Sequence, residues 1–354
     1  MKILPMALLF AARTLVMGQW LDYPTSLIPR TADGKPNLAA PAPRTSDGKP
    51  DLSGLWAMNA GPGHLANVTA DLKPGEIRPW AEALYKQRLG DLGIDDPWTA
   101  KCLPAGPRVI LTGANGPSRI TQTPQLIVIL YEDLTYRQIF MDGRKLPIDP
   151  NPSWMGYSVG RWEGDSLVVE STGFNDRSWL DMGGHPHTES LRITERFRRT
   201  NFGHMDLQVT FDDPKAYTRP WTISFGVSFA ADTNMLEYVC AENEKDREHL
   251  IGRTAEEKGV TVSPEILAKY VGIYETVATT GSAMSARMFR LTLADGQLMI
   301  EIGGNGKIPL IPLSETTFSP RLLGTYEFVK DGRGVVTHLI AYSTEGEVKA
   351  ARKD

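Results

Sequence analysis

Cysteine, net charge and long apolar runs are all scarce in this sequence of 354 residues. Only two cysteines are present, and 38 lysine and arginine residues nearly balance 42 aspartate and glutamate residues. That balance gives no electrostatic reason to expect a nucleic acid or an anionic membrane as partner. The sequence also has no P-loop, no GxGxxG after a strand, no HExxH and no EF-hand loop, which excludes the usual nucleotide, zincin and calcium sites.

The first residues are typical of a secretory signal peptide. Lys2 precedes a mostly apolar run, interrupted by Arg13, that ends at Gly18. We therefore expect residues 1–18 to be removed and the mature protein to be periplasmic or secreted. No later segment reaches the roughly 18 apolar residues that a membrane-spanning helix needs, so no membrane span is expected.

The two cysteines are expected to pair with each other. In an oxidising compartment two cysteines in one folded unit are more often bridged than free, so we predict a Cys102–Cys240 disulfide. The chain-entropy model gives such a long loop a stabilisation of at most about 4 to 5 kcal/mol. The alternative is two buried thiols without a chemical role, and metal binding by the pair is not indicated because the sequence has no CxxC.

Glycine and proline are abundant, with 33 and 25 residues, which favours dense turns and short strands over long helical bundles. A ten-residue segment at 29–38 recurs at 43–52, and its Asp-Gly-Lys-Pro core predicts a turn followed by an extended, exposed stretch. The expected organisation is a signal peptide at 1–18, an extended N-terminal arm at 19–50, a first barrel at 51–250, a connector at 251–262 and a second small β-barrel at 263–354.

One helix is predicted from about Arg78 to Leu89, with Pro79 in its first turn and Gly90 at its end. The remainder of the first unit has the pattern of antiparallel strands. The expected strands are 119–132, 136–142, 157–162, 166–172, 187–198, 205–211, 221–229 and 236–239. In the second unit, Ser263-Pro264 predicts a short helix, after which about eight short strands are expected.

Three stretches resemble known groups of proteins. Gly54-Leu55-Trp56 resembles the GxW opening of lipocalin-like barrels, in which the tryptophan fills the closed end of the barrel. From about Asp51 to Leu250, segments such as GYSVGRWEGDSLVVESTGFNDRSWLD and GHPHTESLRITERFRR resemble a widespread group of exported bacterial proteins. The C-terminal unit, which opens with SPEILAKYVGIYE, resembles the small lipocalin-like barrel appended to relatives of penicillin-binding proteins and class C beta-lactamases.

These resemblances imply a mainly β fold with two tandem antiparallel lipocalin-like β-barrels, the first carrying an added helix and long loops. In its relatives the second barrel is an accessory or assembly module, so a homo-oligomer formed through it is an expected partner. The serine-hydrolase domain that normally precedes such a module is not recognisable, and no lactamase activity is therefore expected.

The segment from His185 to Arg198 has the strongest pattern for chemistry. If it is extended, Leu191, Ile193 and Phe197 identify one face as interior, and the same parity places four ionisable groups there. These groups are His185, His187, Glu189 and Glu195. Because buried carboxylates are costly unless they are paired or bind a metal, we interpret this face as a candidate active site.

Three interpretations of this face remain open. His187 would act as a general base, with Glu195 or Glu189 as its partner or as a general acid. Alternatively His185 and His187 would bind a divalent metal ion, the only cofactor indicated, whose shell one of the carboxylates or a distant histidine such as His204 or His249 completes. In the third, Glu195 pairs with a buried arginine, such as Arg119 or Arg137, and the histidines lie in a loop.

Polar and aromatic residues near the expected barrel mouth are candidate ligand contacts. They are Trp154, Trp179, Arg144, Asp176 and Arg119. The tryptophans would line an aromatic mouth or, equally well, cap the end of the barrel. Gly156-Tyr157-Ser158-Val159-Gly160 matches the GxSxG nucleophile pattern, but a second strand rather than a helix is expected after it, so Ser158 is not expected to be a nucleophile.

The sequence therefore predicts an exported enzyme that acts on a small organic substrate, aromatic or sugar-like, in the mouth of the first barrel. Lyase, hydrolase and isomerase chemistry all fit. The alternative is a non-catalytic, lipocalin-like protein that binds a small-molecule ligand. An enzyme requires the histidine and glutamate side chains to converge beside an open cavity, whereas a binding protein pairs them elsewhere.

Overall fold

The computed structural model describes eight stretches of the chain. They are residues 24–90, 95–113, 116–240, 260–276, 288–302, 307–320, 324–343 and 346–353. The predicted signal peptide, most of the predicted connector and His249 lie outside these stretches. None of the helices in the described stretches is long and apolar enough to pass through a bilayer.

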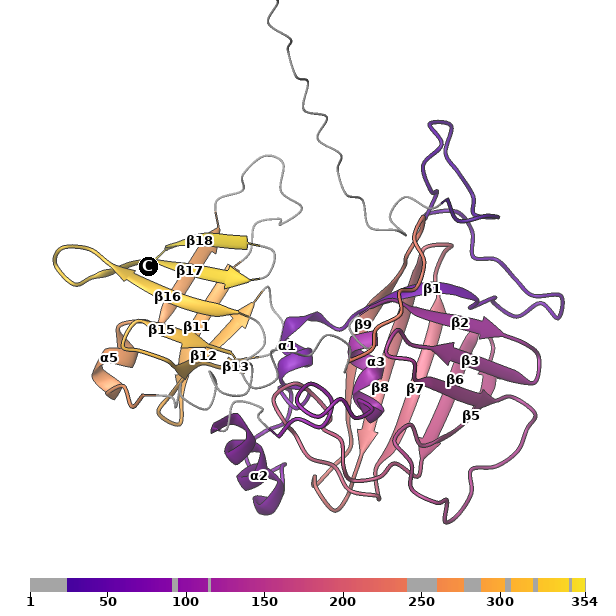
Figure 1. The fold of residues 1–354 in the computed structure, drawn as a ribbon, viewed down its shortest axis with the longest axis horizontal. Helices are drawn as coiled ribbons and strands as arrows, with labels where there is room; N and C mark the ends of the chain where they lie inside the picture. The colour runs from indigo at the N-terminus through magenta and orange to yellow at the C-terminus, as the bar shows by residue number, and fades with distance from the viewer. Residues whose placement is uncertain are drawn as a thin grey trace, which may run out of the picture.

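Nine strands form a closed barrel in chain order, from indigo to pink in Figure 1. They are β1 (Gly54–Asn59), β2 (Ser118–Gln122), β3 (Leu126–Leu130), β4 (Tyr136–Phe140), β5 (Tyr157–Glu163), β6 (Ser166–Thr172), β7 (Arg192–Arg199), β8 (His204–Asp212) and β9 (Trp221–Phe229). β1 pairs with β9 and so closes the barrel. All neighbouring pairs are antiparallel except β4 and β5, which run parallel.

Another nine strands form a second, nearly closed sheet, shown from orange to yellow in Figure 1. They are β10 (Gly272–Thr276), β11 (Met288–Ala294), β12 (Gln297–Ile302), β13 (Ile308–Pro309), β14 (Ile311–Pro312), β15 (Thr317–Ser319), β16 (Thr325–Lys330), β17 (Val336–Ser343) and β18 (Gly346–Arg352). The two end strands, β13 and β14, are separated only by Leu310, which brings the ends of the sheet together. The predicted fold class is confirmed.

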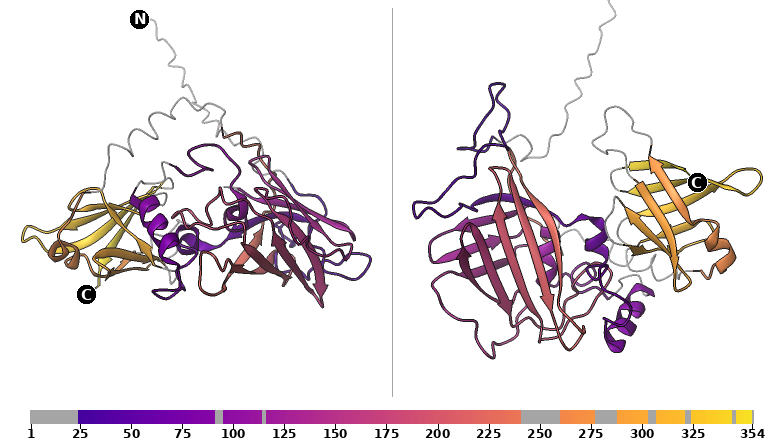
Figure 2. Two further views of the ribbon diagram at one scale, coloured as in Figure 1. Left: turned by 90° about the horizontal axis from the view of Figure 1, so that it is seen from below. Right: turned by 180° about the vertical axis from the view of Figure 1, so that it is seen from behind.

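Short helices lie beside and between the two sheets (Figure 2). They are α1 (Gly61–Ala66), α2 (Pro79–Gly90), η1 (Gly106–Arg108), α3 (Val109–Thr112) and α5 (Pro264–Ala268). The predicted helix with Pro79 in its first turn is confirmed as α2. Ala66 at the end of α1 packs into the core of the second sheet, and Asn67 Nδ2 donates to the Lys307 carbonyl at 3.3 Å. α1 is therefore a point of contact between the two sheets.

The GxW tryptophan lies in the core of the first barrel. Trp56 is fully buried, and its indole N–H donates to the Leu52 carbonyl at 2.9 Å. The Arg199 guanidinium stacks over the indole at 4.8 Å, and the Phe229 ring meets it edge-on at 5.3 Å. A cation held over an aromatic face away from water is a favourable contact, so these side chains stabilise this part of the core.

The N-terminal arm is largely exposed, as expected, and two arginines anchor it to the barrel. Arg30 and Arg44 occupy equivalent positions in the two repeats, and each forms a two-pronged ion pair with the barrel. Their partners are Asp232, after β9, and Asp165, in the turn between β5 and β6. At the end of the first repeat, the Leu38 carbonyl accepts a hydrogen bond from the Gly203 amide at 2.8 Å.

Several strand predictions are confirmed and three are wrong in detail. The hairpin at 157–172 and the strand at 221–229 form as expected, with Gly164 adopting a positive φ of 61° in the hairpin turn. The predicted strand at 119–132 is two strands, because a turn at 123–125 returns the chain on itself. Residues 236–239 form no strand, and the strand expected from residue 187 begins at Arg192.

Candidate functional site

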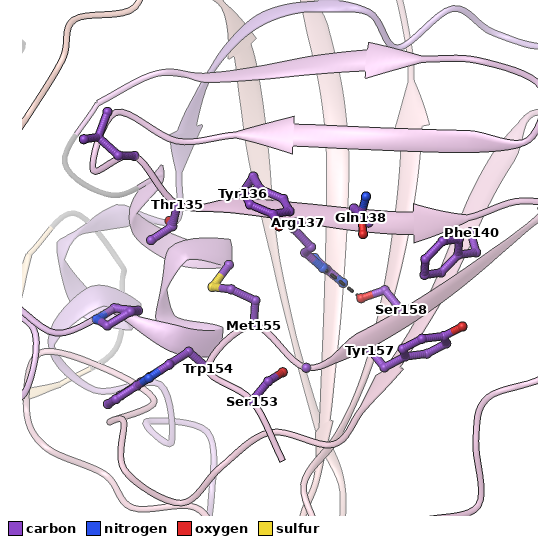
Figure 3. A pocket seen from close by; sticks show the side chains of 13 residues that line it. Thr135, Tyr136, Arg137, Gln138, Phe140, Ser153, Trp154, Met155, Tyr157 and Ser158 are labelled. Carbon is purple, nitrogen blue, oxygen red and sulfur yellow. Dashed lines mark hydrogen bonds between the residues drawn. The ribbon is translucent and has the colours of Figure 1, made fainter. Parts of the chain in front are cut away.

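A cleft opens in the barrel wall between β4 and β5. The two strands run parallel and pair only at Ile139–Ser158 and Phe140–Val159, so the chain segments before these pairs diverge. A cavity of about 460 Å³ lies where they diverge (Figure 3). Its lining is Pro104, Leu134, Thr135, Tyr136, Arg137, Gln138, Phe140, Ser153, Trp154, Met155, Gly156, Tyr157 and Ser158. A volume of this size suits a small organic molecule.

Side chains of β4 point alternately to the outside and to the inside of the barrel, and both kinds line the cleft. Tyr136 and Gln138 point outward and are exposed, whereas Arg137 points into the barrel and is only 3 % exposed. Successive side chains of a strand alternate in this way between the two faces of a sheet. The cleft therefore has aromatic and amide groups on its outer walls and a guanidinium at its inner end.

The Arg137 guanidinium spans the interior faces of four consecutive strands. It donates to Ser158 on β5 at 3.0 Å and to Ser171 on β6 at 2.7 Å, and it forms a two-pronged ion pair with Glu195 on β7. The Tyr131 hydroxyl lies close to the guanidinium and interacts with it electrostatically. Arginine has five N–H donors, and this network uses four of them.

This network decides how Glu195 is bound. Glu195 is 1 % exposed and pairs with Arg137, which is one of the two arginines considered from the sequence. It is not a partner of His187. Burial raises the pKa of the neighbouring Tyr131 hydroxyl well above its ordinary value, so this phenol stays protonated and neutral. Both oxygens of this buried carboxylate are held by one guanidinium, so the charge of Glu195 is paired inside the barrel.

His185 and His187 lie in the loop before β7, not on the strand. The loop arises because Thr188 forms a turn with Leu191 and is held by the Asp213 carboxylate, which accepts from the Thr188 amide at 2.6 Å. The interior parity therefore holds from Leu191 onward but does not extend back through the turn. Glu189, expected inside, is exposed in this turn, and the expectation for it is wrong.

His185 belongs to a buried chain of hydrogen bonds. Its Nδ1 donates to Asp181 at 2.5 Å, and its Nε2 lies 2.8 Å from the Thr69 hydroxyl. The Tyr85 ring of α2 stacks on the imidazole with a centroid distance of 3.6 Å. This order of hydroxyl, imidazole and carboxylate resembles a nucleophile triad, but Asp181 also accepts from the amides of Val68 and Gly184. All three side chains are buried, so the chain of bonds joins the loop to the turn after α1.

His187 is held neutral by its surroundings. Its Nδ1 donates to the Thr188 carbonyl, and its Nε2 lies 2.8 Å from the Ser178 hydroxyl, which is the arrangement of an uncharged ring. Burial lowers the pKa of His187 to about 4 from its ordinary 6.5. Both ring nitrogens are therefore engaged, and the imidazole does not face the cleft.

We expect His187 to make folding pH-dependent. Between pH 6.5 and pH 4 the unfolded chain binds a proton at this ring and the folded chain does not, so stability is complete above about pH 6.5 and falls as the pH drops towards 4. The loss reaches about 3 kcal/mol. Urea unfolding across this pH range should show a shallower decline for His187→Gln than for the wild type. The exposed His204, replaced in the same way, should leave the decline unchanged, and an equal decline in all three proteins would contradict the assignment.

The structure lends no support to a metal at His185 and His187. Each of the four ring nitrogens has a hydrogen-bonding partner within the protein. Among the residues that the structure describes, no group of three or more histidine, cysteine, aspartate or glutamate side chains is placed to hold a metal ion. Ser158 lies inside β5, which continues into a hairpin, so the expectation that it is not on a nucleophile elbow is confirmed.

The predicted ligand contacts fall into three places. Trp154 lines the cleft, and Arg144 borders it: its guanidinium lies 3.9 Å from the Phe140 ring centroid and donates to the Tyr157 hydroxyl at 3.0 Å. Trp179 and Asp176 instead line a separate cavity of about 410 Å³ beside α2. Arg119 donates to Asn234 at 2.6 Å and lines neither cavity. The single aromatic mouth expected from the sequence is therefore divided.

Four aromatic or amide side chains of the cleft were not considered as ligand contacts from the sequence. They are Tyr136, Gln138, Phe140 and Tyr157. Tyr136, Gln138 and Phe140 stand at every second position of a predicted strand, which was a signal that they share one face of it. The sequence contained no signal that β4 and β5 run parallel and diverge, and this divergence turns the outer face into the wall of a cleft.

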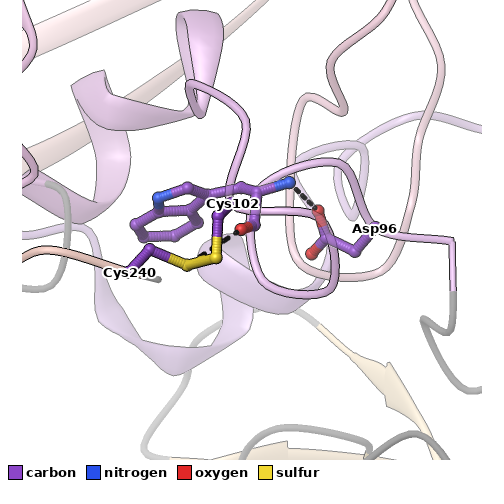
Figure 4. The surroundings of a disulfide bond; sticks show 4 residues. Asp96, Cys102 and Cys240 are labelled. Carbon is purple, nitrogen blue, oxygen red and sulfur yellow. Dashed lines mark hydrogen bonds between the residues drawn. A yellow bond between two sulfur atoms is a disulfide. The ribbon is translucent and has the colours of Figure 1, made fainter. Parts of the chain in front are cut away.

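The disulfide lies next to Trp98. Cys102 and Cys240 are bonded with their Cα atoms 5.4 Å apart, which confirms the predicted pair (Figure 4). Their neighbour Trp98 packs under the Arg108 guanidinium, which forms a fully buried ion pair with Asp96.

Comparison of the sequence with protein-family models and with curated proteins found no match.

Proposed function

We propose that the first barrel binds a small organic ligand, aromatic or sugar-like, in the cleft between β4 and β5. The observation that carries this proposal is the lining of the cleft. Four aromatic side chains surround a cavity of about 460 Å³ that ends in hydrogen-bonding groups. Apolar walls with a few convergent polar groups are typical of small-molecule sites.

The aromatic walls are held in place before any ligand arrives. Phe140 and Tyr157 stack on each other with ring centroids 5.2 Å apart, and Arg144 fixes both through its contact with one ring and its hydrogen bond to the other. Arg144 is itself paired with Asp142 at 2.5 Å. Walls that need little rearrangement cost little conformational entropy on binding, which supports recognition of a ligand here.

Catalysis by His187 and Glu195 stays a prediction. An enzyme of the predicted kind needs His187 and Glu195 to converge beside an open cavity, but Glu195 faces Arg137 and His187 faces Ser178. This geometry favours a ligand-binding protein over an enzyme. Neither histidine lines the cleft. Export to the periplasm or the outside also stays a proposal, supported by the disulfide, as does an oligomer formed through the second sheet.

Tyr136 offers a direct test of the cleft. Its ring is 59 % exposed and lines the cavity, so Tyr136→Ala should leave the fold intact while removing one aromatic wall. We expect the dissociation constant of a ligand bound in the cleft to rise about three- to tenfold. The measurement is isothermal titration or ligand-observed NMR with a panel of small cyclic compounds that includes 4-nitrophenyl β-D-glucoside and 4-hydroxybenzamide.

The matched control is Tyr342→Ala. Tyr342 lies on β17 of the second sheet and is 38 % exposed, so its replacement should not change the binding of any compound. The proposed function fails if no compound of the panel binds, or if binding is the same in the wild type and in Tyr136→Ala.

A further inference from the structure

We infer that the cleft selects an uncharged ligand, and that Glu195 determines this selectivity by neutralising Arg137. The inference rests on the proposed function and specifies its ligand: a ring with one flat apolar face and neutral hydrogen-bonding groups at its edge. It assigns Glu195 to specificity rather than to proton transfer.

The charges along the cleft carry the first step. Arg137 is the only lysine, arginine, aspartate or glutamate among the lining residues. Its charge is cancelled by Glu195, and each of its three nitrogens donates to a side chain inside the barrel. At the rim, Arg144 is likewise paired with Asp142. A charged ligand would therefore enter without a counter-charge waiting for it.

The burial of the pair carries the second step. A carboxylate or phosphate could reach Arg137 only by displacing Glu195, which is 1 % exposed and pairs with no other cation in the described part of the chain. The displaced carboxylate would be left buried and unpaired, which is strongly unfavourable. A cationic ligand would meet the guanidinium itself, which lies between it and Glu195. Both signs of charge are thus disfavoured.

The remaining lining carries the third step. Tyr136, Phe140, Trp154 and Tyr157 supply aromatic faces, and Gln138 together with hydroxyl groups supplies neutral donors and acceptors. Aromatic faces bind flat apolar surfaces, and neutral polar groups bind hydroxyl, amide or ether groups at the edge of a ring. A pyranose and a neutral phenol share this chemistry.

Matched pairs of ligands test the selectivity on the wild-type protein. The pairs are 4-nitrophenyl β-D-glucoside with 4-nitrophenyl β-D-glucuronide, and 4-hydroxybenzamide with 4-hydroxybenzoate, whose members differ in a carboxylate. We expect the neutral member of whichever pair binds to have a dissociation constant at least tenfold lower. Equal or tighter binding of the acid would overturn the inference while leaving the proposed function intact. If neither pair binds, the proposed function itself loses its support, and the inference falls with it.

Glu195→Gln should reverse the preference. The glutamine keeps the size of the side chain but leaves the charge of Arg137 uncompensated. In each pair, the affinity of the acid relative to that of the neutral member should therefore rise at least tenfold. The control is Glu163→Gln, which makes the same change of charge at an exposed position of β5. An unchanged preference in a folded Glu195→Gln variant would overturn the role of Glu195. If that variant does not fold, the wild-type preference decides the inference.

Discussion

Replacing Arg137 by methionine is expected to lower the free energy of unfolding by about 3 to 5 kcal/mol. The substitution removes the guanidinium but leaves the Glu195 carboxylate inside the barrel, 1 % exposed and without its partner. It also removes the hydrogen bonds from the guanidinium to Ser158 and Ser171, which keep only the bond between their two hydroxyls. Since whole proteins are stable by only about 5 to 15 kcal/mol, the loss should be evident in urea or guanidinium unfolding.

Two further variants distinguish the effect of breaking the buried ion pair from the effect of removing any arginine charge. Arg161→Met removes an arginine that lies on the outside of β5 and pairs with two exposed glutamates, and we expect it to cost less than about 1 kcal/mol. The double variant Arg137→Met/Glu195→Leu removes both buried charges, and most of the lost stability should return. A double variant no more stable than Arg137→Met would mean that the cost comes from lost packing and not from the unpaired carboxylate.

The alternation of apolar and polar residues was sufficient to predict the β5–β6 hairpin and the inward-facing residues of β7. The hairpin of β5 and β6 follows from alternation on both sides of Glu163-Gly164-Asp165, where glycine tolerates the positive φ that the turn requires. Within β7, the interior parity of Ile193, Glu195 and Phe197 was also correct. Period-two patterning decides which side chains point inward only while the strand continues.

The site depends on features that local pattern does not contain. The turn at Thr188 ends the parity of β7, because a carboxylate 25 residues later holds the amide and hydroxyl of this threonine. The partner of Glu195 lies 58 residues away, and the sequence left Arg119 and Arg137 as equal choices. The tertiary structure decides between the two arginines. Arg137 reaches Glu195 across two intervening strands, whereas Arg119 donates to Asn234.

Loss of the disulfide is expected to have the second large effect, a decrease of about 2 to 5 kcal/mol in the free energy of unfolding. The Cys102–Cys240 bond joins residues 138 apart in the sequence, so it removes much of the freedom of the unfolded chain. In the folded chain it holds the irregular segment after β9 against the barrel. Two hydrogen bonds to Glu132, from the amides of Leu236 and Tyr238, assist it there.

Cys102→Ser/Cys240→Ser should therefore have a global and a local consequence. Guanidinium unfolding should show the lost stability, and the wild type in reductant should match the double variant. Hydrogen exchange at the amides of Leu236 and Tyr238 should accelerate more than exchange at the amides of β9, which should reflect only the lower global stability, because the ladder bonds of β9 to β1 and β8 do not involve the disulfide. Equal acceleration in both segments would show that the bond stabilises the whole barrel rather than this segment. An unchanged unfolding free energy would mean that the buried Arg108–Asp96 pair and Trp98 hold the region without it.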